Sequence, residues 1–347
     1  MRIPKASVVA TVAALFAALT GCGFLTGESA PSASDGTCTE QNLRLATIRA
    51  EDDPATLAAN HFAESVARAT DGRITVRVFP NSQLGDFNGI FAGLSSGQGV
   101  DLFYEGITIY PTLEGANAFT VVSVPFMWDS YEQLVGVLRS EEFAELFEQA
   151  AQQTGVRVIA VEGDAEPRAL SANRPIVTPE DMRGLKLRIA QAPMPQEFAR
   201  ALGANPQVVP LADLYLALRQ GVVDAQENGA ITMINQSLHE VQSHYMPTNY
   251  IRDARSWYVN DAWWNGLCAE DREAITQAAI EAGRLNTAEV GKQLTAAEEQ
   301  LRSTISVVEP DVEAFRAALE GRFDQFDGQL WPEGLLEQTR QIRDAQR

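Results

Sequence analysis

The sequence has few of the residues that nucleic-acid binding and metal coordination require. Lysine occurs only at Lys5, Lys186 and Lys292, and the 347 residues include three histidines and three cysteines. Acidic side chains number 46 against 27 basic ones, giving a formal charge of −19. This charge argues against a nucleic-acid partner, because phosphates require a basic face. The histidines lie on no metal-ligand spacing and no Cys-x-x-Cys motif occurs, so we expect no bound metal.

Long apolar runs are also missing, except at the N-terminus. Two basic residues there precede an apolar run of 14 residues from Ala6 to Leu19, which is short for a membrane span and typical of a signal peptide. The run ends in Leu-Thr-Gly-Cys, which resembles a bacterial lipobox and would leave Cys22 as a lipidated N-terminus. Ordinary secretion with cleavage elsewhere is the alternative. We predict an extracytoplasmic protein that is lipid-anchored to the cytoplasmic membrane, with a signal peptide and lipobox over 1–22 and a flexible Ser/Gly-rich tether over 23–40.

With Cys22 assigned to the lipid, two cysteines remain. Cys38 and Cys268 form an even pair in an exported chain. An oxidising compartment favours a disulfide between them, and two unrelated thiols are the alternative.

Strand and helix patterns alternate along the chain in two separate runs. The first has strands at Leu43–Ile48 and Ile74–Phe79, with a helix that starts at Pro54 between them. The second run extends from the strand Leu185–Ile189 to the strand Val222–Gln226. Strand–helix–strand order is typical of a parallel α/β sheet. Two such runs predict an α/β protein with two sheets, and hence two lobes with a cleft between them.

Two long helices are predicted beside these runs. One is an amphipathic helix over Tyr131–Gln153. The other covers Ala269–Ser303, and its roughly 35 residues would be about 50 Å long, which exceeds the width of one lobe. Its heptad pattern is poor. We therefore expect a strut that runs across both lobes, not a coiled coil.

Arg188 lies at the end of the predicted strand Leu185–Ile189 and has no obvious carboxylate nearby in the sequence. A buried guanidinium without an anion costs several kcal/mol. A ligand anion is one candidate partner, and an ion pair with a protein carboxylate is the alternative.

One motif favours an enzyme. Gly93–Gly97 matches the Gly-x-Ser-x-Gly elbow of α/β-hydrolases, and His239 and His244 follow downstream. The elbow needs a strand before the serine and a helix after it, whereas here the helix pattern comes first. Lys292 lacks the upstream glycine of a phosphate-binding loop. A secreted serine hydrolase is therefore the lesser alternative, and we predict a protein that is not an enzyme and needs no cofactor.

Several blocks of the sequence resemble the solute receptors of tripartite ATP-independent periplasmic (TRAP) transporters, the DctP-type family. These blocks lie at Phe79–Asp86, Gly184–Arg188, Leu202–Pro206 and Tyr215–Asn228. Taken together in this order and spacing, they are specific to the family. The resemblance covers roughly Leu43 to the C-terminus. It implies a periplasmic binding protein-like (Venus flytrap) fold that closes over a carboxylate ligand, with the long helix spanning both lobes.

The resemblance also implies which residues bind the ligand. It assigns Arg188 to a two-pronged salt bridge with the ligand carboxylate, which suits a planar guanidinium. Asn228 matches a ligand-contacting asparagine that the family usually follows with proline, whereas this chain has Gly229. The further candidates are Arg168, Glu105, Asp86, Leu211 and Tyr215.

Each further candidate has a plainer interpretation. Arg168 could form a salt bridge at the hinge. Glu105 and Asp86 would select hydroxyl or amine groups of a ligand, or would be solvated. Leu211 and Tyr215 would form an apolar wall of the cleft, or belong to the core.

The predicted function is a receptor that binds a small organic acid and delivers it to integral membrane TRAP permease subunits. A substrate-binding lipoprotein of an ATP-driven (ABC) transporter is the alternative. A C4-dicarboxylate, a sugar acid or a similar carboxylate would each satisfy one arginine, so the sequence leaves the ligand open. The first lobe is predicted at 41–164 and 254–293, and the second at 165–253 and 294–347.

Overall fold

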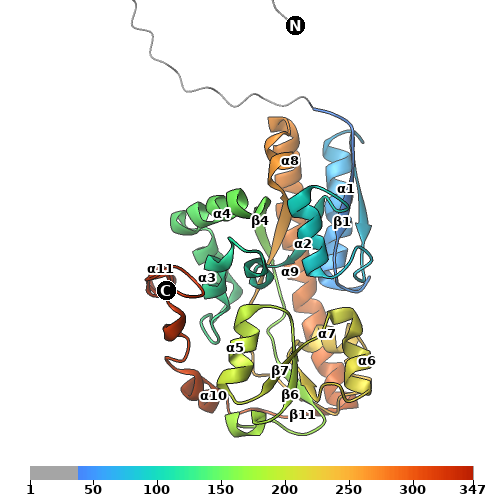
Figure 1. The fold of residues 1–347 in the computed structure, drawn as a ribbon. Helices are drawn as coiled ribbons and strands as arrows, with labels where there is room; N and C mark the ends of the chain where they lie inside the picture. Colours follow the sequence, from blue (N-terminus) through green and yellow to red (C-terminus); the bar gives the residue numbers. More distant parts are fainter. Residues whose placement is uncertain (1–37, 347) are drawn as a thin grey trace, which may run out of the picture. The chain divides into compact units, whose positions relative to one another are not determined.

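The computed structural model shown in Figure 1 describes residues 38–346. The predicted signal peptide at 1–22, with Cys22, lies outside the described residues, as does most of the predicted tether. Between residues 38 and 346, no helix is long and apolar enough to cross a membrane.

The first sheet has five strands in the order β2-β1-β3-β10-β4. Strand β1 pairs in parallel with β2 and β3, while β10 pairs antiparallel with β3 and β4. The helix between β1 and β2 begins where Asp53 accepts a hydrogen bond from the backbone N–H of Ala55, with Pro54 at its first position. Strand and helix bounds are β1 (Gln41–Ala46), α1 (Pro54–Ala69), β2 (Ile74–Phe79), α2 (Phe87–Ser96), β3 (Leu102–Gly106), β4 (Val156–Asp164), β10 (Ala254–Asn260) and α8 (Asp261–Asn265).

The second sheet has six strands in the order β11-β9-β5-β8-β6-β7. Strand β6 pairs in parallel with β7 and β8, and β5 pairs antiparallel with β8 and β9. The bounds are β5 (Leu170–Ala172), β6 (Lys186–Ile189), α5 (Pro193–Ala201), β7 (Asn205–Val208), α6 (Leu214–Arg219), β8 (Ala225–Gln226), α7 (Ala230–Asn235), β9 (His244–Met246) and β11 (Ser306–Val307). The predicted α/β fold with two sheets is therefore confirmed.

The chain passes between the sheets from β4 to β5, from β9 to β10 and, through the long helix that follows β10, to β11. The first two of these connections lie side by side. They pair with each other through the backbone: Arg168 N–H donates to Ile251 O at 3.1 Å, and Tyr250 N–H donates to Arg168 O at 3.3 Å. Arg168 thus lies in the connection between the two sheets.

Helix α9 (Ala269–Thr304) contacts α1 and β4 beside the first sheet, and α7 and β11 beside the second (Figure 1). It crosses β4 closely at Gly283, where a Cβ atom would lie 2.5 Å from the Glu162 carbonyl oxygen. Asn286 then donates to the Asp164 carbonyl oxygen at 2.6 Å. The predicted long helix is confirmed, and it is tied to β4 at the point where that strand leaves the first sheet.

The predicted helix over Tyr131–Gln153 is wrong, because the chain breaks at Ser140 into α3 (Tyr131–Leu138) and α4 (Glu141–Thr154). The Ser140 hydroxyl accepts the Phe143 N–H and so starts a new helix. Other predicted elements are shorter than expected. Strand β8 has only two residues. The chain between β7 and β8 forms a 3₁₀ turn at Leu211–Asp213 followed by α6.

Two helices follow β11 near the C-terminus, α10 (Val312–Leu319) and α11 (Leu335–Asp344). Helix α11 contacts α3, and Arg343 donates to the Met127 carbonyl oxygen at 3.2 Å. This helix therefore lies with the first lobe, although the predicted range 294–347 places it in the second. The other lobe boundaries stay predictions.

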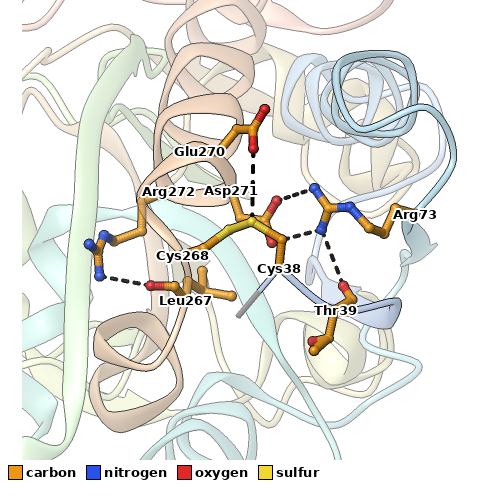
Figure 2. The surroundings of a disulfide bond; sticks show 8 residues. All are labelled: Cys38, Thr39, Arg73, Leu267, Cys268, Glu270, Asp271 and Arg272. Atoms are coloured by element: carbon orange, nitrogen blue, oxygen red, sulfur yellow. Dashed lines mark hydrogen bonds and ion pairs between the residues drawn. A yellow bond between two sulfur atoms is a disulfide. The ribbon is translucent and has the colours of Figure 1, made fainter. Parts of the chain in front are cut away.

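The disulfide expected between Cys38 and Cys268 is present in the structure (Figure 2). Its two Cα atoms are 5.3 Å apart. Cys268 is the residue just before α9, and Cys38 precedes β1. Beside the bond, Arg73 forms a two-pronged ion pair with the buried carboxylate of Asp271 and also donates to the Thr39 carbonyl oxygen. The start of the first sheet is thus fastened to the start of the long helix.

Candidate ligand-binding cleft

A pocket lies at the carboxyl ends of the parallel strands, with walls from both sheets. Arg49 follows β1 and Glu105 lies near the end of β3, while Arg188 and Asn228 come from the ends of β6 and β8. Ligands of open α/β sheets bind at this edge because the loops there are free to carry binding groups. Six of the seven predicted ligand-binding residues line the pocket: Arg188, Asn228, Arg168, Glu105, Asp86 and Leu211.

Tyr215 is the predicted residue that does not line the pocket. It packs against the core around α6 and α9, and its hydroxyl donates to Glu240 at 3.0 Å. Its assignment to the wall of the cleft is therefore wrong, and the alternative of a residue that packs on the core is correct. Sequence spacing after Pro210 could not distinguish Tyr215 from Leu211, because the structure places Leu211 in a 3₁₀ turn and Tyr215 in α6.

Arg188 is 3% exposed, and its Nε donates to the Val209 carbonyl oxygen at 2.8 Å. Within residues 38–346, no carboxylate lies within 4.0 Å of its guanidinium, and that one carbonyl is its only side-chain hydrogen-bond partner. Burial lowers the pKa of Arg188 to about 10, and the charges of Arg168 and Arg49 act in the same direction against Glu227. The side chain remains charged at neutral pH, with the rest of its fork unpaired.

Arg168, in contrast, is paired. Its Nε and Nη2 both donate to the fully buried carboxylate of Glu227, the second at 2.6 Å. The Tyr250 hydroxyl donates to the same carboxylate at 2.6 Å. Burial opposes the charge on Arg168, but the Glu227 carboxylate outweighs it and raises the pKa of Arg168. Arg168 is thus both a wall of the pocket and the hinge ion pair of the alternative interpretation.

Glu105 is 1% exposed, so the alternative in which it is solvated is wrong. Arg49 donates from Nε and Nη2 to the two carboxylate oxygens of Glu105, at 2.8 and 2.7 Å. Arg255 forms an ion pair with the same carboxylate. Burial, together with the charge of Arg49, lowers the pKa of Arg255 to about 9. One carboxylate therefore serves two arginines, the buried Arg255 and the partly buried Arg49.

Asn228 is 4% exposed and already held by the protein. Its backbone N–H and its amide group both donate to Gln226 Oε1, at 2.7 and 2.6 Å, and its Oδ1 accepts from Arg168 at 3.2 Å. The next residue, Gly229, has no room for a side chain, because a Cβ atom would lie 2.6 Å from the Pro167 carbonyl oxygen. The departure from the family's usual proline therefore has a local cause in the close approach of residues 166–167.

The two lobes touch across the mouth of the pocket. Asn88 of α2 donates from its amide to Gln191 Oε1, just after β6, at 2.9 Å. Asp86 is exposed beside it and accepts the Gly89 N–H at 2.9 Å, which caps α2. Its second carboxylate oxygen is available to a solute at the mouth.

Three further residues shape this site and were not predicted from the sequence: Glu227, Arg49 and Asp253. Glu227 stands in the Ala-Gln-Glu-Asn block that was singled out for its asparagine. A glutamate directly after a strand end, next to a predicted ligand contact, is a signal that could have identified it.

The serine of the Gly-x-Ser-x-Gly match does not form a nucleophile elbow. Ser95 lies within α2, and Gly97 ends that helix with φ of 67°. His239 and His244 make their hydrogen bonds to Met233 O and to Ser243, near the second sheet. In the described part of the chain, neither histidine is bonded to this serine. The hydrolase alternative has no support from this motif.

A family model for bacterial extracellular solute-binding proteins, family 7 (DctP), matches residues 45–329. The chain belongs to this family. A solute-binding protein of Roseobacter denitrificans is 30% identical over 305 residues, covering 88% of this chain and 92% of the relative. The C4-dicarboxylate-binding periplasmic protein DctP of Rhodobacter capsulatus is 31% identical over 239 residues, or 69% of this chain and 71% of the relative.

A solved structure supports the same family assignment. It is the TRAP periplasmic solute-binding protein of Roseobacter denitrificans OCh 114 with bound L-galactonate, which is 28% identical to this chain. Its TM-score is 0.80 over 88% of this chain and 99% of that one. The predicted TRAP-type solute receptor with a two-lobed DctP fold is thus confirmed, and the alternative of an ABC-transporter receptor is not favoured.

Proposed function

We propose that the cleft binds a small organic acid by its carboxylate, with Arg188 as the principal contact. The observation that carries the proposal is a buried guanidinium with no anion partner between residues 38 and 346. A carboxylate would supply two oxygens to the unused N–H groups and would offset the cost of burying the charge. Arg168 is paired with Glu227, and Arg49 shares Glu105 with Arg255. Arg188 is therefore the pocket arginine that lacks an acidic partner among the described residues, and it supplies the local positive charge that a strongly acidic protein needs for an anionic solute.

The relatives support a carboxylate in general more than one particular acid. One relative is a C4-dicarboxylate-binding protein, and the solved structure of another holds L-galactonate. These solutes share a carboxylate and differ in the rest of the molecule. The common group suits the Arg188 contact, and the variable part suits the first-lobe wall of the cleft.

Recovery of the natural ligand tests this function. Protein purified without added acids and then denatured should release a carboxylic acid, identified by mass spectrometry, at up to one equivalent. Arg188→Met, purified in parallel, should release little or none, because it retains the apolar stem of the side chain and loses the charge. A released compound without a carboxylate, or equal recovery from both proteins, would contradict the proposal.

The bound acid passes, in this proposal, to integral membrane TRAP permease subunits, and a lipid on Cys22 holds the receptor at the membrane face. The support for the anchor is the Leu-Thr-Gly-Cys sequence after a short apolar run. We expect labelled fatty acid to enter the wild-type protein in a bacterial host and to be absent from Cys22→Ser. Equal labelling of the two proteins would refute the anchor while leaving the cleft untouched.

A further inference from the structure

Among the described residues that line the pocket, Arg188 has no acidic partner and two acids have no basic partner. Arg49 is held by Glu105, and Arg168 is held by Glu227. Arg188 remains for a ligand. The acids that line the same pocket without a basic partner among the described residues are Asp253 and Asp86.

Asp253 is built into the first-lobe wall just before β10 and is 7% exposed. Its Oδ1 accepts the N–H groups of Thr108 and Ala254, at 3.2 and 2.9 Å, and its Oδ2 accepts the Thr108 hydroxyl at 2.7 Å. Gly106 leaves the space that this carboxylate fills, since a Cβ atom there would collide with it. Oδ2 therefore retains acceptor capacity, which suits a hydroxyl group of a ligand.

We propose that the cleft selects a hydroxylated monocarboxylate over the matching dicarboxylate, with Asp253 as a specificity-determining residue and Asp86 acting in the same way at the mouth. This inference rests on the proposed binding of a carboxylate at Arg188. A second ligand carboxylate at this wall would face these two acids, which have no basic partner among the described residues. A terminal hydroxyl in the same place would instead donate to them.

Two pairs of acids test the selection directly. D-erythronate and meso-tartrate differ only in a terminal CH₂OH or carboxylate, and so do L-galactonate and galactarate. Calorimetric titration at pH 7, where both carboxylates of each diacid are ionised, should show the monoacid of at least one pair binding about tenfold tighter or more, the size expected for one like-charge contact at partial burial.

Two variants locate the cause. Asp253→Asn should narrow the ratio between the acids of a pair by about tenfold. Asp86→Asn should narrow this ratio less. The variant keeps the cap of α2, because asparagine also caps helices. Tyr215→Phe, away from the pocket, should leave the ratio unchanged. If Asp253→Asn folds poorly, the affinity ratio of the wild-type protein for the two acids of a pair, together with that of Asp86→Asn, still decides the test.

The outcomes separate this inference from the proposed function. Binding of the diacid as tight as or tighter than its monoacid in every pair that binds, or no binding by any of the four acids, overturns the selection. If the diacid is preferred and Arg188→Met abolishes its binding, the carboxylate receptor stands and only the selection fails. If Arg188→Met binds the monoacid like wild type, the proposed function fails instead.

Discussion

Arg188→Ala should weaken binding of the acid recovered from the protein by roughly thirty- to several-thousand-fold, equivalent to about 2–5 kcal/mol. The variant removes the free cation of the cleft and leaves the ligand carboxylate desolvated beside Glu227 and Asp253. Arg188→Lys should also be severely impaired, because a point charge cannot reproduce the fork. Titration calorimetry of the three proteins with that acid measures the effect.

Stability without ligand is the control for this prediction. Since Arg188 has no anion partner in the described residues, Arg188→Met removes an uncompensated buried charge and keeps the stem packed. Its unliganded melting temperature should equal or exceed that of wild type. Binding by Arg188→Ala within a few-fold of wild type would show that Arg188 is a structural residue. Outright unfolding of both Arg188→Ala and Arg188→Met would show the same.

The second large effect is expected at Glu105. Glu105→Gln should lower the free energy of unfolding by about 3–5 kcal/mol, because it leaves the buried guanidinium of Arg255 and the partly buried one of Arg49 side by side without their anion. In a protein of this size, we expect the melting temperature to fall by about 10 °C. Thermal unfolding followed by circular dichroism measures the shift.

The matched control is Glu289, whose ion pair with the exposed Lys292 lies on the surface of α9. Glu289→Gln removes the same charge but should change the free energy of unfolding by less than about 1 kcal/mol. If Glu105→Gln melts within 2 °C of Glu289→Gln, the Arg49–Glu105–Arg255 cluster does not stabilise the fold as argued.

The regular parts of the fold could be predicted from local patterns. The strand at Ile74–Phe79 alternates and lies between Gly72 and Pro80. The long helix has no proline over its length, although it contains Gly283 and Gly291. The break at Ser140 was missed because the apolar spacing continues through it. The start of the second helix is marked by a capping serine and two glutamates. This local signal predicts the break only if it is given more weight than the apolar periodicity.

The location of the candidate site could be predicted from the sequence. Which arginine pairs with which carboxylate in the site could not. Arg188 stood out because no acid lies near it in the chain, and the structure leaves it without one among residues 38–346. Glu105, however, is 56 residues from Arg49 and 150 from Arg255. A sequence reveals which charges exist, while the choice of partners depends on how strands from distant segments are brought together.

The Cys38–Cys268 bond has a consequence for the order in which the protein matures. Its two cysteines are separated by 230 positions, so Cys38 must wait for roughly 10–50 s of synthesis before its partner exists, at about 5–20 residues per second. Both β1 and α1 can form long before the bond closes. The disulfide therefore joins the start of the first sheet to the start of α9 only after the strands of that sheet have been synthesised, and it is not a guide for their early folding.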